Sequence, residues 1–321
     1  MTGTSTANRP LNRDQVLISV ERLHGLLAGS PAVGRQPDGA TQAQTEAEHL
    51  PPTILDVRWE LPTSRDPFNG KPLYLAGHIP GAVYIDLDTE LADPPSPQLG
   101  RHPLPSDERL QHALERCGVT YGNLVVVYDA IGGLGAARAW WLLRDAGFDV
   151  RLLDGGLPAW QACGYPLATD DVTPLPSLLH LVRGQMPTIE IDDIPEFVQT
   201  GILFDARGGI RYRGEVEPLD PRPGHIPGAD SAPVGHDLDK QGYFISDADL
   251  QARFVRHGVT FDGQPSPPIA VYCGSGITAS HEVAALAILG VEAALFPGSY
   301  SQWSSDPTRE VETGHPTPRG A

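Results

Sequence analysis

The chain has 321 residues, 40% of them hydrophobic and 20% charged, which is enough for two globular domains that each bury a core. Its formal net charge of −17 argues against nucleic acid or an anionic membrane surface as a partner, because both attract basic proteins. No stretch approaches the roughly 18 apolar residues of a membrane span, and the polar N-terminus has no secretory pattern, so we expect a cytoplasmic protein.

The first half of the chain alternates predicted strands and helices. It starts near Asp14, where DQVLISVERLHGLL predicts a lead-in strand or helix, and residues 29–50, rich in Gly, Ala, Gln and Pro, predict an insertion or flexible loop. The segments that follow are a short strand ILDVRW (54–59), the motif GHIPGA (77–82), a helix DERLQHALERCG (107–118), a buried strand LVVVYD (124–129), a helix ARAWWLLRDAG (137–147) and a strand VRLLDGG (150–156).

The second half repeats this pattern. Its segments are LFDAR (203–207), GHIPGA (224–229), DADLQARFVRHG (247–258), IAVYC (269–273), TASHEVAALAILG (278–290) and PGSYSQW (297–303). His225 follows His78 by 147 positions and Cys273 follows Asp129 by 144. Such a near-constant spacing indicates a tandem duplication.

Alternating strands and helices predict an α/β fold in each copy, a doubly wound parallel sheet with helices on both faces. We place a first domain at residues 14–170, a linker at 171–187, a second domain at 188–307 and a tail at 308–321.

The two copies differ where a ligand of such a sheet would bind, beyond the carboxyl ends of the strands. The first copy has Asp129 at a strand end and the second has Cys273, followed by a Gly-rich loop and a helix that opens near Thr278. Inward-pointing backbone N–H groups and the helix dipole would favour a thiolate there, which is the nucleophilic form of cysteine. The alternative is that Cys273 is a small buried apolar residue.

The other two cysteines, Cys117 and Cys163, occupy helix-end positions and are expected to be structural. Three cysteines without paired spacing predict neither a disulfide framework nor a zinc site, and the histidines are scattered. We therefore expect no metal.

The duplicated GHIPGA, DAR at 205–207, CGSGIT at 273–278 and GSYSQW at 298–303 resemble the rhodanese family over about residues 15–305, apart from 29–50. The resemblance implies two rhodanese-like domains, a monomer with its site between them, and no cofactor. It also implies a silent first domain with Asp129 in place of the cysteine. In the implied ping-pong reaction, Cys273 takes sulfur from an anionic donor as a persulfide and passes it to cyanide or to a thiol acceptor such as thioredoxin.

The composition of the loop after Cys273 bears on the sulfur donor. Family members that prefer thiosulfate carry basic residues in this loop, whereas Gly-Ser-Gly is similar to the 3-mercaptopyruvate sulfurtransferase branch. In that branch a loop Ser, a His and an Asp assist proton movement, which implies Ser275, His78 and Asp66 here. His78 has an alternative role in stabilising its turn, because His225 repeats it without any implied chemistry.

A carboxylate on the sulfur donor calls for an arginine partner. The segment IRYRG (210–214) resembles the family's substrate-binding stretch and points to Arg211; Arg222 is a second candidate, although the local spacing departs from the family there. The predicted loop contacts to the sulfur donor are Gly274, Gly276, Ile277 and Thr278.

Other functions fit less well. GGLGAA (132–137) with Asp154 imitates a dinucleotide fingerprint, but the repeat explains this loop as the counterpart of the Cys273 loop. A cysteine phosphatase needs an arginine at the position that Ala279 occupies. Thiosulfate as the donor, and a non-enzymatic rhodanese-like binding module, remain as alternatives.

Overall fold

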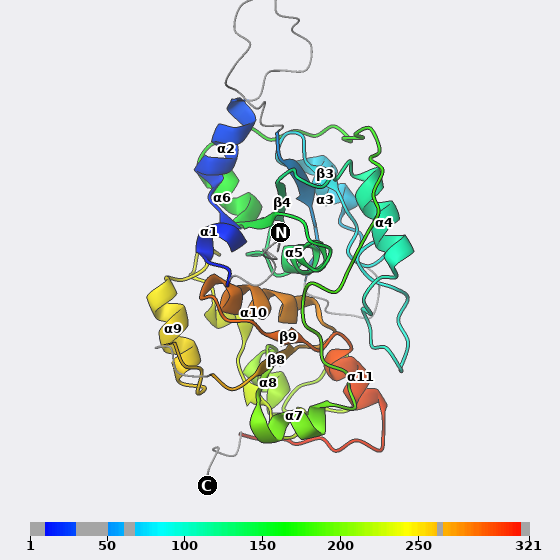
Figure 1. The fold of residues 1–321 in the computed structure, drawn as a ribbon, viewed down its shortest axis with the longest axis vertical. Coiled ribbons are helices and arrows are strands. Elements are labelled where there is room, and N and C mark those ends of the chain that lie inside the picture. The colour runs from blue at the N-terminus through cyan, green and yellow to red at the C-terminus, as the bar shows by residue number, and fades with distance from the viewer. Residues whose placement is uncertain (1–9, 30–50, 61–67, 262–265, 316–321) are drawn as a thin grey trace, which may run out of the picture.

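The computed structural model describes residues 10–29, 51–60, 68–261 and 266–315, and Figure 1 shows its two α/β halves. Within these residues, no helix combines the length and the apolar character needed to cross a membrane. The predicted insertion at 29–50 lies outside the described residues from position 30 onward.

Each half is built on a parallel sheet, as the duplication predicts. The first sheet has the order β1-β5-β4-β2-β3, with β1 at Leu17–Ile18, β2 at Thr53–Asp56, β3 at Val83–Tyr84, β4 at Val125–Tyr128 and β5 at Val150–Leu153. The second has the order β7-β6-β8-β9, with β6 at Ile202–Asp205, β7 at Asp230–Ser231, β8 at Ile269–Tyr272 and β9 at Ala294–Leu295. The order β3-β2-β4-β5 in one half therefore matches β7-β6-β8-β9 in the other.

Helices cover both sheets. In the first half they are α1 (Arg13–Val16), α2 (Val20–Ala28), α3 (Lys71–Ala76), α4 (Asp107–Arg116), α5 (Ala136–Asp145) and α6 (Gly156–Ala162). In the second half they are α7 (Ile194–Thr200), α8 (Gly209–Tyr212), the 3₁₀ turn η2 (Val234–His236), α9 (Asp247–Val255), α10 (Ile277–Ile288) and α11 (Ser299–Ser305). The lead-in segment thus forms both of the predicted alternatives, a short strand β1 flanked by α1 and α2.

The segment at 171–187 has no helix or strand of its own and runs along the first half, where the backbone N–H of Leu179 binds the Glu115 side chain at 3.0 Å. The start of the predicted tail is attached to the second half, because Glu312 and His225 exchange backbone hydrogen bonds of 3.0 and 2.8 Å.

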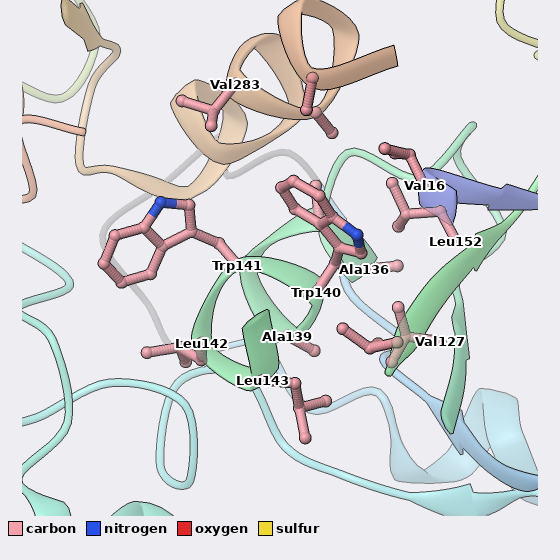
Figure 2. Packing of buried hydrophobic residues seen from close by; sticks show 14 of the residues in the cluster. Val16, Val127, Ala136, Ala139, Trp140, Trp141, Leu142, Leu143, Leu152 and Val283 are labelled. Carbon is pink, nitrogen blue, oxygen red and sulfur yellow. The ribbon is translucent and has the colours of Figure 1, made fainter. Parts of the chain in front are cut away.

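The two halves meet along α5 and α10, which lie between the two sheets in Figure 1. Trp140 and Trp141 point from α5 toward α10 in Figure 2, and both indoles are fully buried. The apolar cluster they belong to includes Val127 of the first sheet and Val271 of the second, so one core continues across both halves. Because α10 begins just after Cys273, this junction also positions the candidate site.

Candidate active site

Cys273 stands directly after β8, whose four residues are all buried, and the Cys273 side chain is itself buried. The loop that follows is short and turns at Gly276, which has a φ of 80°. A Cβ at Gly276 would come within 2.5 Å of the Pro297 carbonyl oxygen, so only glycine fits there. The Gly276 backbone N–H points back at the Cys273 sulfur, with N···Sγ at 3.2 Å.

The segment that precedes and forms α11 holds this loop in place. The Tyr300 N–H donates to the Cys273 carbonyl at 3.0 Å, and the Ser301 N–H donates to the Gly274 carbonyl at 2.9 Å. Ser299 accepts the Cys273 N–H at 3.2 Å and adopts a φ of 53°, which is uncommon for a residue other than glycine. The GSYSQW motif is therefore a brace for the cysteine loop.

The equivalent loop of the first half shows what such a loop binds. The Asp129 carboxylate accepts four backbone N–H groups at 2.7–3.0 Å, and these come from Ile131, Gly133, Gly135 and Ala136. Converging N–H groups of this kind form an anion site. Asp129 fills that site with its own charge, which leaves no room for a phosphate and explains the false dinucleotide pattern.

Ser275 lies in a chain of three polar side chains that spans both halves. Its Oγ is 2.7 Å from Nδ1 of His102, and Nε2 of the same histidine is 3.3 Å from the Asp88 carboxylate. The other Asp88 oxygen accepts the Phe68 N–H at 3.3 Å. Because Asp88 favours a proton on Nε2, Nδ1 is left to accept the Ser275 hydroxyl hydrogen.

His102 is suited to accept a proton. Burial lowers its pKa below the ordinary value of 6.5, although the neighbouring Asp88 carboxylate opposes this shift. The imidazole is therefore neutral at pH 7 and free to act as a base toward Ser275.

Among the described residues, the histidine in contact with Ser275 is His102, and His78 has other partners. His78 is buried against the Tyr74 ring, with ring centroids 3.9 Å apart, and its Nδ1 is 2.9 Å from the Tyr74 carbonyl oxygen. His225 makes the same two contacts with Tyr212. These matched contacts favour the turn-stabilising role of both histidines. Asp66 lies outside the described residues.

Two arginines face the backbone beside Cys273. A Cβ at Gly274 would lie 2.7 Å from Nη2 of Arg101 and 3.5 Å from Nη1 of Arg211. Arg211 comes from α8, and Arg101 comes from the segment at 85–106 between β3 and α4. The structure thus brings Arg211 to the loop and adds an arginine from the other half.

Arg222, the second predicted arginine, has its side-chain partners elsewhere in the second half. Its guanidinium donates to four backbone carbonyls at the end of the chain, those of Ser304, Arg309, Trp303 and Asp306. It anchors the segment after α11.

A third arginine, Arg138 of α5, reaches the cysteine loop from beneath. It is fully buried and donates to the carbonyls of Leu91, His102, Pro103 and Gly276 at 2.9–3.4 Å. Burial lowers the pKa of Arg138 to about 9, and Cys273 opposes this shift. Among the described residues it forms no salt bridge with a carboxylate, so an anion at Cys273 would be its natural counter-charge.

Comparison with known proteins agrees with this geometry. The model of the rhodanese-like domain matches the chain twice, at residues 39–163 and 190–306. The chain belongs to the rhodanese-like family. The family assignment confirms the two α/β domains and the resemblance seen in the motifs.

Curated relatives of this rhodanese-like protein are sulfurtransferases. SseB of Mycobacterium tuberculosis, which carries a provisional thiosulfate sulfurtransferase name, is 43% identical over 94% of this chain and 98% of its own length. A Pseudomonas aeruginosa protein provisionally named as a 3-mercaptopyruvate sulfurtransferase is 40% identical over 81% of this chain and 92% of its own length. The crystal structure of SseA from Escherichia coli, a 3-mercaptopyruvate enzyme, matches with a TM-score of 0.71 and 31% identity, over 89% of this chain and 98% of that one. This rhodanese-like protein is a sulfurtransferase.

Sequence reasoning missed three residues of the site, Asp88, Arg101 and His102. All three lie in the segment at 85–106, whose counterpart at 232–246 in the second half is shorter. The greater length of this segment in the first copy could have identified these residues. The longer segment reaches the Cys273 loop of the second half, whereas the shorter one has no cysteine loop opposite it.

Proposed function

We propose that this sulfurtransferase moves a sulfur atom from 3-mercaptopyruvate through a persulfide on Cys273 to cyanide or a thiol acceptor such as thioredoxin. The observation that carries the proposal is the contact of Ser275 in the cysteine loop with His102, which in turn faces Asp88. The cysteine loop itself contains no basic residue.

In the first half-reaction the Cys273 thiolate attacks the sulfur of 3-mercaptopyruvate and forms an S–S bond. The C–S bond of the sulfur donor breaks, and its electron pair leaves with the pyruvate enolate. The thiol hydrogen of the sulfur donor is lost and the enolate carbon gains a proton, so Cys273 ends as an anionic persulfide and pyruvate is released. Ser275 and His102 are in position to carry that proton.

In the second half-reaction the acceptor attacks the outer sulfur of the persulfide. A new bond forms between the acceptor and that sulfur, the S–S bond breaks, and its electron pair restores the Cys273 thiolate. Cyanide would leave as thiocyanate and a thiol would leave as a persulfide.

The proton requirement favours 3-mercaptopyruvate over thiosulfate. Mercaptopyruvate brings a thiol hydrogen and leaves as a carbon base, so its cleavage needs a proton carrier. Thiosulfate leaves as sulfite and needs none. A Ser-His-Asp chain beside Cys273 therefore has a use with the first sulfur donor only.

The decisive experiment compares kcat/KM for 3-mercaptopyruvate and for thiosulfate in cyanide-dependent thiocyanate formation. We expect a clear preference for 3-mercaptopyruvate. A preference for thiosulfate would keep the sulfurtransferase and reject the donor, whereas no transfer from either would favour a binding module.

Cys273→Ser should abolish transfer from both sulfur donors, because a hydroxyl cannot form the persulfide. Mass spectrometry of the wild-type protein after incubation with 3-mercaptopyruvate should detect one extra sulfur atom on the peptide that contains Cys273. Cys163→Ser serves as the control, because Cys163 is exposed at the end of α6 and should be dispensable. Turnover by the Cys273→Ser protein would disprove the mechanism. The acceptor, the monomeric state and the cytoplasmic location stay predictions.

A further inference from the structure

Asp220 lies between the two arginines beside Cys273. Its carboxylate accepts a hydrogen bond from Arg211 at 2.9 Å and another from Arg101, so it joins a residue of the second half to one of the first. The Asp220 side chain is only 1% exposed, while those of Arg101 and Arg211 are 21% and 20% exposed. The carboxylate is thus covered and the two guanidinium groups are accessible.

A second carboxylate completes the group. Glu217 binds Arg211 through both of its oxygens, at 2.7 and 3.1 Å, and is also buried. Glu217 also accepts a hydrogen bond from Arg207 at 3.3 Å, but Arg207 is itself paired with Asp205 by contacts of 2.6–3.1 Å. Apart from that pair, Arg101 and Arg211 carry two positive charges, and Glu217 and Asp220 carry two negative charges. The arginines that face the sulfur donor therefore have their charge already balanced.

The pairing of the two arginines with two carboxylates affects how many negative charges a bound anion can carry. A site with two unpaired arginines would favour a dianion, because each charge would meet its own counter-charge. In the observed site a singly charged carboxylate adds one uncompensated charge and a dianion adds two. The electrostatic cost of each uncompensated negative charge is larger because Glu217 and Asp220 are buried, where water and salt screen their charge less.

We propose that Asp220 is a specificity-determining residue that makes the arginine pair select singly charged carboxylate donors against dianionic thiosulfate. This inference rests on the proposed function, since it concerns the sulfur donor of the same Cys273 site. Asp220 acts without touching the reacting sulfur, through the charge and orientation of Arg101 and Arg211.

The test is the ratio of kcat/KM for thiosulfate to kcat/KM for 3-mercaptopyruvate. Asp220→Asn keeps the size of the side chain and removes its charge, and should raise this ratio by roughly tenfold to a hundredfold, the effect of one charge a few ångströms away. Arg101→Gln should lower the ratio, because it removes the positive charge that Asp220 balances. Opposite effects at two residues in contact would not arise from general loosening of the site.

Glu215→Gln is the matched control. It removes one negative charge from the same segment, but Glu215 is exposed and binds Arg213 rather than the arginine pair. Its ratio should equal that of the wild type. An equal rise in Glu215→Gln would assign the effect to the overall negative charge of the protein and overturn the proposal.

Binding separates this inference from the proposed function. In a Cys273→Ser background, which cannot turn over, calorimetry should show that Asp220→Asn strengthens thiosulfate binding more than pyruvate binding. Equal changes for both ligands would overturn the role of Asp220 even if the wild type prefers 3-mercaptopyruvate. Absence of sulfur transfer in the wild type would instead reject the proposed function, and the binding comparison would still decide the role of Asp220.

Discussion

At the residue scale, His102 links a loop of the first half to Ser275 of the second, and its environment sets its protonation. Burial lowers its pKa below 6.5, so protonation, which would block its use as a base, occurs only at more acid pH. We expect kcat for 3-mercaptopyruvate to fall to half of its plateau value only at a pH below 6.5. A half-maximal point above pH 6.5 would contradict this assignment.

Replacement of His102 should separate the two sulfur donors. His102→Asn should lower kcat for 3-mercaptopyruvate about a hundredfold or more, the usual contribution of a positioned acid–base group. It should change thiosulfate turnover little, because sulfite leaves without a proton. His225→Asn is not a suitable control because that side chain is buried under Tyr212, whereas His112→Asn on α4 removes a histidine outside the site. Equal losses with both sulfur donors would assign His102 a structural role.

The residues that could be predicted from sequence are those whose role is local. Cys273 and Ser275 belong to one loop between a strand and a helix, and Arg211 follows a recognisable strand end. The contact between His102 and Ser275 joins positions 173 residues apart and depends on how the two halves pack. The sequence pointed to His78 through the GHIPGA motif, but that motif occurs in both copies. A motif that both copies share cannot identify a site that is built around a cysteine found in only one of them.

At the element scale, α5 and α10 occupy equivalent places and each reaches into the opposite loop. Arg138 of α5 donates to the Gly276 carbonyl in the cysteine loop at 3.4 Å, and His281 of α10 is 3.2 Å from the Gly132 carbonyl in the aspartate loop. Burial lowers the pKa of His281 to about 4, so that residue is neutral. The cation therefore faces the cysteine, while the aspartate loop meets an uncharged ring.

This asymmetry predicts that Arg138 supports the anion at Cys273. Arg138→Met should slow alkylation of Cys273 by iodoacetamide at pH 7 by about tenfold or more and lower kcat for both sulfur donors, since both reactions need the thiolate. Arg138→Lys should restore part of the alkylation rate by restoring the charge. His281→Gln, which removes the corresponding contact to the aspartate loop, should leave alkylation unchanged. Equal rates in the Arg138→Met and wild-type proteins would show that Arg138 only braces the loop.

At the scale of the whole molecule, the site exists only where the two halves are held together. Cys273, Ser275 and Arg211 come from the second half, and Arg101 and His102 come from the first. All four residues of β4 are buried, and successive side chains pack into different cores. Val125 and Val127 face the core shared with the second half, and Val126 faces a separate core on the other side.

Two buried tryptophans on opposite faces of the first sheet test this division. Trp140 lies in the shared core and Trp160 in the separate one, and both are almost completely buried. Replacing either by alanine should lower the free energy of unfolding by about 3–5 kcal/mol, as large cavities in cores do. Denaturant unfolding followed by circular dichroism gives this value for each variant.

We expect the two variants to have similar free energies of unfolding but different values of kcat/KM. Trp140→Ala removes packing between α5 and α10, so Arg138 and His102 lose their fixed position over the cysteine loop and kcat/KM should fall. Trp160→Ala leaves that contact intact and should keep kcat/KM near the wild-type value in conditions where both variants are folded. If the two variants lost activity in proportion to stability alone, the junction of the halves would matter only for folding. A selective loss in Trp140→Ala would mean that the first half takes part in catalysis by holding its residues against Cys273.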